Sequence, residues 1–410
     1  MSKRIFAITF IYVCSAVAWI ILAGAIRVRT EFQDRKLRNG VAQLWGAKQT
    51  QSAPSVYFKS TSTGGNIGNQ GTQNLPLEAS DIKVDLKLEH RKKGLLWYST
   101  YRVAFSGKYQ VANNSSNPRE IFLNFKFPTK GAVYDNFRFT VGGEEIRDIE
   151  LQSGHITKSM QLSQGQSEDF EISYESQGLD VWSYDFGEDV NPVRNFSLVL
   201  QTDFDEIDFP QDSISPTHKE QTDNGWKLTW EYSNLLSGAK IGMITPQKLN
   251  PGPWTSRVTA TAPVSLFLFF FLMFVFTTVK KIKIHPMNYF FVAAAFFSFH
   301  LLLSYLVDHI SIHAAFWICS AVSIFLVVSY MRLVVGGRFA FIEIALSQLI
   351  YLVLFSYTFF FKGYTGLAIT IMCICTLFVV MQFTGKVDWE QVFAKSEKPT
   401  DSEALTQRPV

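Results

Sequence analysis

A few ionisable side chains lie in or beside the most apolar part of this sequence. His300 falls near the middle of one apolar run, and Glu343 lies a little more than one helical turn inside another. Asp308, His309 and His313 cluster in a short polar turn between two such runs. Because an ionisable group inside hydrocarbon is costly, each of the five is a candidate functional position. Together they would suit a proton relay or a small polar cavity, since histidine titrates near neutral pH and burial raises the pKa of a carboxyl group.

Each of these residues also has a simpler structural explanation. His309 and His313 are four residues apart and could bind one metal ion on a helical turn, but a wet turn at the level of the lipid headgroups explains them more simply. His300 would hydrogen-bond to a neighbouring helix, and Glu343 would pair with Arg338 or lie at the membrane interface. The sequence has no phosphate-binding glycine loop, nucleophile elbow or HExxH helix. We therefore expect no catalytic residue, no metal site and no cofactor.

The elements that must position these residues are apolar runs long enough to cross a bilayer. Hydrocarbon offers no partner to a bare backbone, so such runs must be helices, and about 20 residues span the ~30 Å apolar layer. One run lies at the N-terminus and five lie in the last third, at residues 5–26, 262–279, 287–307, 311–331, 339–361 and 363–383. Ala23-Gly24-Ala25 resembles a signal-peptidase site, but the length of the first run favours an uncleaved anchor.

The polar middle of the chain changes to a period of two. Apolar and polar residues alternate in several runs between residues 81 and 243, and turn-forming clusters separate the runs. This pattern predicts a mainly antiparallel β-sandwich. An acidic loop at residues 203–208 could bind calcium, although a solvated turn is the simpler reading. Residues 27–48 continue the first helix, whereas the Gln-, Ser- and Thr-rich residues 49–76 read as a flexible linker or as a loop that orders on contact.

The predicted fold is therefore a mixed membrane protein with six transmembrane helices, one N-terminal and five C-terminal, and an extracytoplasmic, mainly antiparallel β-sandwich. The predicted parts are an N-terminal anchor (residues 1–26), a helical stalk with a polar linker (27–80), the β-sandwich (81–250), a five-helix bundle that opens after a proline-rich entry (260–384) and a tail (385–410).

Charges in the short loops predict the orientation in the membrane. One side collects most of the basic residues, namely Lys3, Arg4, Lys280, Lys281, Lys283, Arg332, Arg338 and Lys386. By the positive-inside rule both termini are cytoplasmic and residues ~27–260 are periplasmic. The lipid bilayer is then the first partner. The net charge of +3 is too small to indicate nucleic acid.

Three sequence segments of the membrane region are specific enough to carry a family resemblance. They are His285-Pro286-Met287-Asn288-Tyr289, the run from Phe299 to Ile310 that ends in Asp308-His309, and Thr384-Gly385-Lys386-Val387-Asp388-Trp389. They resemble the inner-membrane CreD family over residues ~260–390. The half before residue 250 reads as diverged, because the Gly-Pro-x-Leu-x-x-Pro segment of that family is missing. The resemblance implies a bacterial inner-membrane protein linked to two-component control and to envelope phenotypes such as colicin tolerance, and it supplies no catalytic residues.

Two functions remain open at this point. The first is a non-enzymatic protein whose periplasmic β-domain binds or senses an envelope component or a partner protein. The second is a small proton-coupled transporter that uses the polar residues of the C-terminal bundle.

Overall fold

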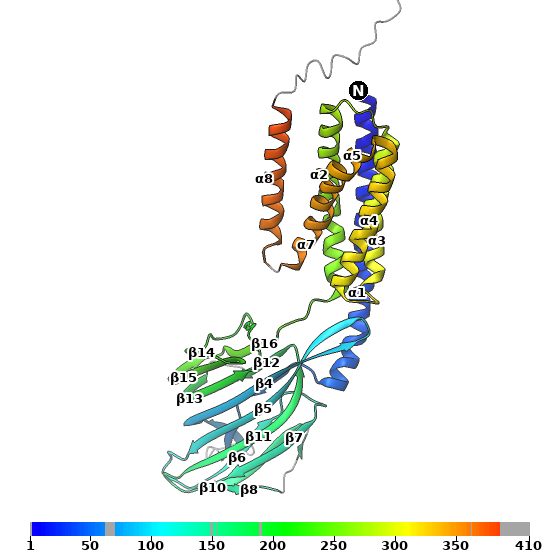
Figure 1. Cartoon of the computed structure of the whole chain (residues 1–410). Coiled ribbons are helices and arrows are strands. Elements are labelled where there is room, and N and C mark those ends of the chain that lie inside the picture. The colour runs from blue at the N-terminus through cyan, green and yellow to red at the C-terminus, as the bar shows by residue number, and fades with distance from the viewer. Residues whose placement is uncertain are drawn as a thin grey trace, which may run out of the picture. The chain divides into compact units, whose positions relative to one another are not determined.

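A computed structural model of the chain describes residues 2–61, 70–147, 151–152, 154–187, 191–361 and 363–385. The chain forms two compact units, which we call the bundle unit (Met1–Gln33 with Asn250–Val410) and the β unit (Asp34–Leu249). Helix α1 (Ser2–Trp45) contributes residues to both (Figure 1). The predicted tail at residues 386–410 lies outside the described residues.

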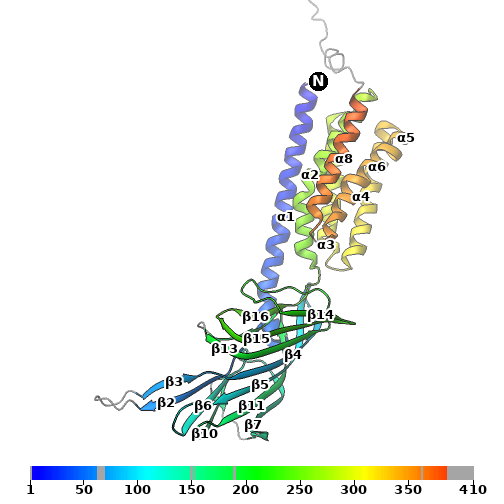
Figure 2. The ribbon, with the colours of Figure 1, turned by 90° about the vertical axis from the view of Figure 1, so that its left-hand side faces the viewer.

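Six helical segments in the described residues are long and apolar enough to cross a membrane, which confirms one N-terminal and five C-terminal spans. After α1 they are α2 (Pro251–Val279), α3 (Pro286–Leu306), α4 (Ile312–Val335), a composite fifth segment and α8 (Thr365–Thr384). The fifth consists of α5 (Gly337–Phe339), η1 (Ala340–Ile344), α6 (Ala345–Gln348), η2 (Leu349–Leu354), α7 (Phe355–Tyr357) and η3 (Thr358–Phe360), in which η1 and η2 are π-helical. Helix α8 lies beside α2 (Figure 2).

Helix α2 begins earlier than its hydropathy suggests. The sequence places this span from about residue 262 and ends the strands at a proline-rich entry, but the helix starts at Pro251. Proline suits the first helical turn because its fixed φ fits and its missing N–H would have no partner there. The polar first turns are helical because Trp254 and Val258 are buried on one face. Packing, rather than apolar composition, therefore sets this helix start.

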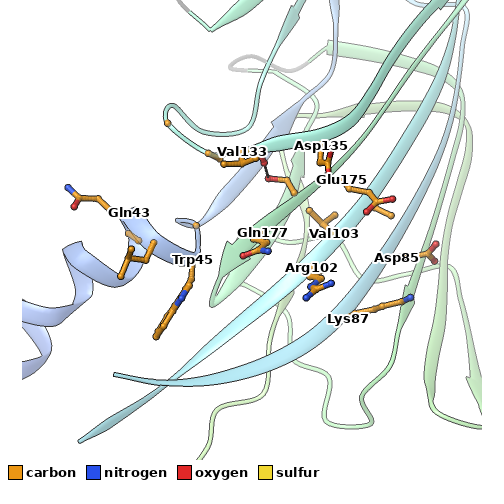
Figure 3. Close-up of a pocket in the computed structure, with 17 residues that line it drawn as sticks. Gln43, Trp45, Asp85, Lys87, Arg102, Val103, Val133, Asp135, Glu175 and Gln177 are labelled. Carbon is orange, nitrogen blue, oxygen red and sulfur yellow. Dashed lines mark hydrogen bonds between the residues drawn. The ribbon is translucent and has the colours of Figure 1, made fainter. Parts of the chain in front are cut away.

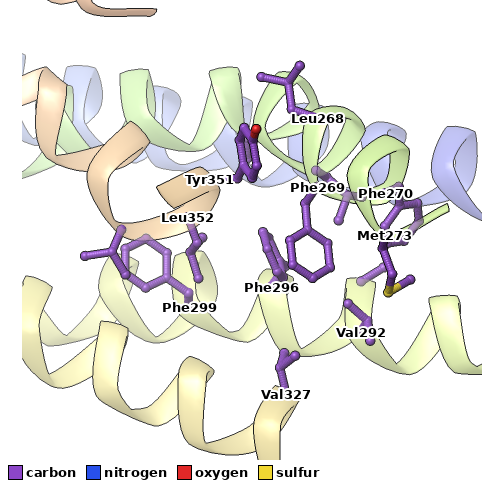
Figure 4. Packing of buried hydrophobic residues seen from close by; sticks show 14 of the residues in the cluster. Leu268, Phe269, Phe270, Met273, Val292, Phe296, Phe299, Val327, Tyr351 and Leu352 are labelled. Atoms are coloured by element: carbon purple, nitrogen blue, oxygen red, sulfur yellow. The ribbon is translucent and has the colours of Figure 1, made fainter. Parts of the chain in front are cut away.

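Aromatic and aliphatic side chains fill the centre of the bundle unit (Figure 4). The rings of Phe269 and Phe296 lie 4.8 Å apart, which joins α2 to α3. Phe299 and Phe316 meet edge-to-face at 5.7 Å and join α3 to α4. The rings of Trp254 and Phe360 lie 4.5 Å apart, which joins α2 to the fifth segment. Such close contacts matter in lipid, where helix association depends on packing.

The β unit contains three open sheets in the described residues. The largest has the order β14 (His218–Thr222), β15 (Gly225–Ser237), β13 (Asn191–Thr202), β4 (Ala79–Lys93), β5 (Leu96–Ala112), β11 (Ser167–Leu179), β7 (Tyr134–Val141) and β8 (Glu144–Glu145). The second has the order β3 (Gln70–Leu75), β2 (Ser55–Thr61), β6 (Arg119–Lys126), β10 (His155–Leu162) and β9 (Leu151–Gln152). The third is β1 (Gln49–Ser52), β12 (Val181–Asp185) and β16 (Lys240–Ile244).

The pairing is antiparallel except between β1 and β12 and between β13 and β4, so the prediction of a mainly antiparallel β region is confirmed. Alternation along β4 buries Ile82, Val84 and Leu86 and exposes the residues between them. All three sheets contribute to one hydrophobic core, as the fully buried Leu123, Leu198 and Trp182 show. Burying each large apolar side chain contributes about 1.5–3 kcal/mol.

The segment that reads as a linker, residues 49–76, instead contributes strands β1, β2 and β3 among its described residues. Two of its glutamines, Gln49 and Gln51, are buried and form hydrogen bonds. The Gln49 amide donates to Ser176 Oγ (2.9 Å) and to the Gln177 carbonyl (2.8 Å). Gln51 donates to the Lys126 carbonyl (3.1 Å) and accepts from the Tyr174 hydroxyl (2.8 Å). A polar composition misleads here because residues far along the chain supply hydrogen-bond partners to these buried amides.

The turn from α1 into β1 depends on Gly46. Its φ of +95° favours glycine, and a Cβ there would overlap the carbonyl of Gln177. We expect Gly46→Ala to lower the free energy of unfolding by about 2–5 kcal/mol, from backbone strain plus steric overlap. Denaturant unfolding of the full chain in detergent, followed by tryptophan fluorescence, measures this.

Gly131→Ala is the matched control, because Gly131 has φ +79° but open space around its Cβ. It should cost about 1–2 kcal/mol from strain alone. Equal losses in the two variants would contradict the packing argument.

Candidate functional site

His300 is buried in α3, with 1% of its surface exposed. Its Nδ1 donates to the Phe296 carbonyl of the same helix (3.2 Å), so the proton lies on Nδ1. The imidazole meets Trp19 of α1 edge-on at 5.8 Å and Phe299 at 4.8 Å. Its Nε2 has no hydrogen-bond partner among the described residues. The predicted hydrogen bond to a neighbouring helix is therefore wrong in its partner, since the ring bonds to its own helix and packs on α1.

Asp308 lies in the turn after α3 and forms an ion pair with Arg29 of α1 at 3.2 Å. The same guanidinium donates to the Ser304 carbonyl (3.0 Å) and lies 5.8 Å from the centre of the Tyr305 ring. An ion pair that is partly exposed contributes about 1 kcal/mol or less by itself. Its main effect is to join the end of the first span to the α3–α4 turn.

The two histidines of this turn have separate surroundings. His313 stacks on the ring of Phe360 at 4.6 Å and His309 is exposed. Within the described ranges, no group of three His, Cys, Asp or Glu side chains could hold a metal ion. In the acidic loop, Asp203 accepts from the backbone N–H of Leu88 on β4 (2.7 Å), and Asp208 accepts from the backbone N–H of Phe209 (2.9 Å).

Glu343 forms an ion pair with Lys280, at the end of α2, and not with Arg338. Arg338 precedes Glu343 by five residues, which places the two about 140° apart around a helix. Lys280 comes from another helix and needs no such alignment. The pair lies where η1 interrupts the α-helical pattern, and the second carboxylate oxygen of Glu343 is buried without a partner among the described residues.

The five candidate residues do not meet in one cavity. In the part of the chain that the structure describes, no hydrogen bond or ion pair joins any two of them. Along α3 alone, the eight residues from His300 to Asp308 correspond to about 12 Å. Each residue instead has its own local contacts, and this geometry offers no continuous proton path among them.

An uncharged polar network inside the bundle unit was missed by reasoning on ionisable residues. Gln348 is fully buried in α6, between the two π-helical segments. Its amide donates to Ser323 Oγ (3.0 Å), which donates to the Ala295 carbonyl (2.8 Å). Its Oε1 has no partner in the described residues. In the sequence, the signal for this network was a single glutamine within an apolar run. In the structure, its place between two π-helical segments is notable because such segments are frequent at functional sites.

A cleft of about 680 Å³ opens into the hydrophobic core of the β unit; we call it the core cleft. Apolar side chains form much of its wall, namely Val56, Leu75, Leu77, Phe186, Val193 and Phe196. Asn124 and His155 also line it, and Asn124 Oδ1 and His155 Nδ1 are buried without a partner among the described residues. An apolar cleft with a few unpaired polar groups is the usual form of a small-molecule site.

The charged groups at the core cleft are basic. Lys126 and Arg194 line it and none of the described lining residues is acidic, although Arg194 is paired with Glu78 at 3.0 Å. Burial raises the pKa of the Tyr184 phenol, another lining residue, well above its usual value, so this hydroxyl stays neutral. The cleft therefore combines an apolar interior with neutral hydrogen-bonding groups and a basic rim.

A second cleft of about 530 Å³, the stalk cleft, lies between the end of α1 and the face of the largest sheet (Figure 3). Trp45 and charged residues of both signs line it, including Lys87, Arg102 and Glu175. Several of these charges already have partners, since Arg102 lies 3.6 Å from Glu89 and Glu175 accepts from Asn136. Because these charged side chains of the stalk cleft already have partners in the protein, they need no ligand. The core cleft is therefore the stronger candidate site.

Substitutions at His300 separate packing from proton chemistry. His300→Phe keeps an aromatic ring against Trp19 and should change the free energy of unfolding by less than about 1.5 kcal/mol. His300→Ala leaves a cavity and should lower it by about 2–4 kcal/mol. Thermal unfolding in detergent measures both variants. If His300→Phe were as unstable as His300→Ala, the imidazole nitrogens rather than the ring would hold the helices together.

Comparisons with known proteins agree with the membrane architecture. The family model described as inner membrane protein CreD matches residues 1–390, so the match includes the half that reads as diverged. Of the motif Thr384 to Trp389, only Thr384 and Gly385 lie within the described residues. A solved structure of a candidate nutrient-binding protein from Legionella pneumophila aligns at 7% identity and a TM-score of 0.33, over 55% of this chain and 76% of that chain. No curated protein matches. Because the family model covers nearly the whole chain, the chain belongs to the CreD family of inner membrane proteins.

Proposed function

We propose that this chain is a non-enzymatic protein of the bacterial inner membrane whose periplasmic β unit binds an envelope component, and that this binding serves envelope integrity or stress response. Both termini are then cytoplasmic. The distribution of basic residues in the short loops supports this orientation, since Lys281, Lys283, Arg332 and Arg338 all lie at the end of the bundle that holds the N-terminus.

The observation that carries the proposal is the pair of buried, unpartnered polar atoms in the core cleft. Asn124 Oδ1 and His155 Nδ1 lie beside apolar walls without a partner among the described residues. A buried acceptor without a partner costs about 1–3 kcal/mol. A ligand that donates to these atoms and fills the apolar space would recover this free energy.

The bundle unit supports a role as anchor. Asp308 and Glu343 are paired with cations of other helices, His300 is packed between aromatic rings, and His313 is stacked on a ring. Such contacts join helices and leave no shared polar path.

A small proton-coupled transporter is the second candidate. The observation that favours it is Gln348, a buried amide with an unpartnered oxygen between two π-helical segments. In this case the bundle unit, and not the β unit, would carry out the function, which is transport.

One substitution in each unit separates the two functions. Asn124→Leu removes the unpartnered acceptor and fills part of the core cleft, so it should leave the chain as stable as before or more stable by up to about 1–2 kcal/mol, while abolishing the envelope function. Gln348→Leu should leave that function intact. Complementation of a deletion strain, scored by sensitivity to detergent and to colicin, gives the activity, and denaturant unfolding of each purified full-length variant gives the stability.

Asn117→Leu is the matched control, because Asn117 is exposed and does not line the cleft. It should complement fully. Full complementation by Asn124→Leu together with loss of function in Gln348→Leu would overturn the proposal in favour of transport.

A further inference from the structure

A polar cluster lies at the end of the bundle unit that holds the N-terminus. Tyr289 of α3 has no exposed surface, and its hydroxyl has no hydrogen-bond partner among the described residues. Arg4 of α1 and Thr277 of α2 lie within side-chain hydrogen-bonding reach of this hydroxyl, although neither meets the geometry of a hydrogen bond with it in the described residues. Arg4 Nε and Nη2 and Thr278 Oγ1 are also buried without partners in the described ranges. Residues of α1, α2 and α3 thus lie together at the Tyr289 hydroxyl, and two nitrogens of the Arg4 guanidinium there have no partner in the described residues.

The His-Pro-Met-Asn-Tyr segment positions this cluster. His285 Nδ1 accepts from the backbone N–H of Met287 (3.2 Å) and caps α3, and Pro286 occupies its first turn. Asn288 Oδ1 accepts from the Tyr330 hydroxyl of α4 (2.8 Å). The cap of His285 and the hydrogen bond of Asn288 therefore hold the start of α3 in position. They thereby also position the next residue, Tyr289, in the polar cluster. This role explains why the segment combines a cap, a proline and two polar side chains.

The charge at this cluster is not balanced by the protein that the structure describes. No ion pair of Arg4 occurs in the described residues, and the carboxylate of Glu343 is paired with Lys280. A guanidinium whose nitrogens are withdrawn from water is strongly destabilising without an anion. The N-termini of α1 and α3 lie at the same end and add partial positive charge. All of these groups favour an anion with several acceptor oxygens.

Apolar side chains that follow Arg4 and Tyr289 indicate which kind of molecule carries this anion. Ile5, Phe6, Phe290 and Phe291 follow Arg4 and Tyr289 in sequence and are 40%, 74%, 47% and 48% exposed. On spans of this hydropathy, such residues face acyl chains. A ligand with a phosphate at the cluster and hydrocarbon beside these side chains is a phospholipid.

We propose that Arg4 and Tyr289 bind the phosphate of an anionic phospholipid headgroup between α1, α2 and α3. The guanidinium donates to the phosphate oxygens, and the Tyr289 hydroxyl supplies a further donor. Lys281 and Lys283, both exposed at the same end, make the surroundings basic and favour an anionic over a zwitterionic lipid. This site is independent of the core cleft and of what the β unit binds.

The test uses the full-length chain in detergent with phosphatidylglycerol, phosphatidylethanolamine or inorganic phosphate as probes. Native mass spectrometry gives lipid occupancy, and thermal unfolding gives the shift in Tm caused by each probe. Wild type should retain phosphatidylglycerol in preference to phosphatidylethanolamine. Arg4→Gln and Tyr289→Phe should each weaken phosphatidylglycerol binding by about tenfold or more, as expected for loss of a charge-assisted hydrogen bond.

Lys283→Gln is the matched control, because it removes an exposed cation from the same end and should weaken binding by no more than about threefold. Without lipid, Arg4→Gln should have a Tm equal to or above that of wild type, which separates loss of binding from misfolding. Unchanged phosphatidylglycerol binding in Arg4→Gln and Tyr289→Phe would overturn the proposal. So would a Tm shift from inorganic phosphate as large as that from the lipid.

Discussion

The bundle unit depends on the seam along which α1 contacts the other helices. The buried apolar residues in the described part of its first span are Trp19, Ala23 and Ile26, which recur at helical spacing and form one narrow stripe. The stripe is extended by specific contacts on both sides. The Tyr12 hydroxyl donates to the Pro263 carbonyl (3.3 Å), and Ser256 Oγ donates to the Ala23 carbonyl (3.0 Å). Because lipid provides no hydrophobic force between helices, close approach and hydrogen bonds of this kind decide whether α1 stays attached.

The basic residues that follow the first span run against the positive-inside rule, and three of them have carboxylate partners. Arg27 is paired with Glu31 at 2.8 Å and Arg29 with Asp308 at 3.2 Å. Arg38 is paired with Asp180 at 2.7 Å within the β unit. These cations have structural partners, so their number says little about orientation. Arg4 differs from them, because its buried nitrogens have no partner in the described residues.

Features that depend on residues close together in the sequence can be predicted from it, whereas contacts between residues far apart in the sequence cannot. Hydropathy and alternation are local, and they predict the six spans and the strands of the β unit. Partners are not local, because Lys280 and Glu343 belong to different helices and Arg29 meets Asp308 across most of the chain. The buried amides of Gln49 and Gln51 misled for the same reason, since their partners come from strands far along the sequence. Of the candidate site, the ionisable residues could be read from sequence, but the core cleft could not, because strands from all three sheets form it.

Polar atoms that are buried without partners are candidates for ligand binding where a cleft or an unbalanced charge accompanies them. The ion pair of Asp308 and the stacking of His313 use those side chains within the protein. Asn124 and His155 in the core cleft, and Tyr289 with Arg4 in the bundle unit, retain unused hydrogen-bonding capacity. Each such atom lowers stability unless something else satisfies it. These two places, one lined by apolar side chains of a β core and one by lipid-facing aromatics, are therefore best explained by two different ligands, each supplying the groups that its own site lacks.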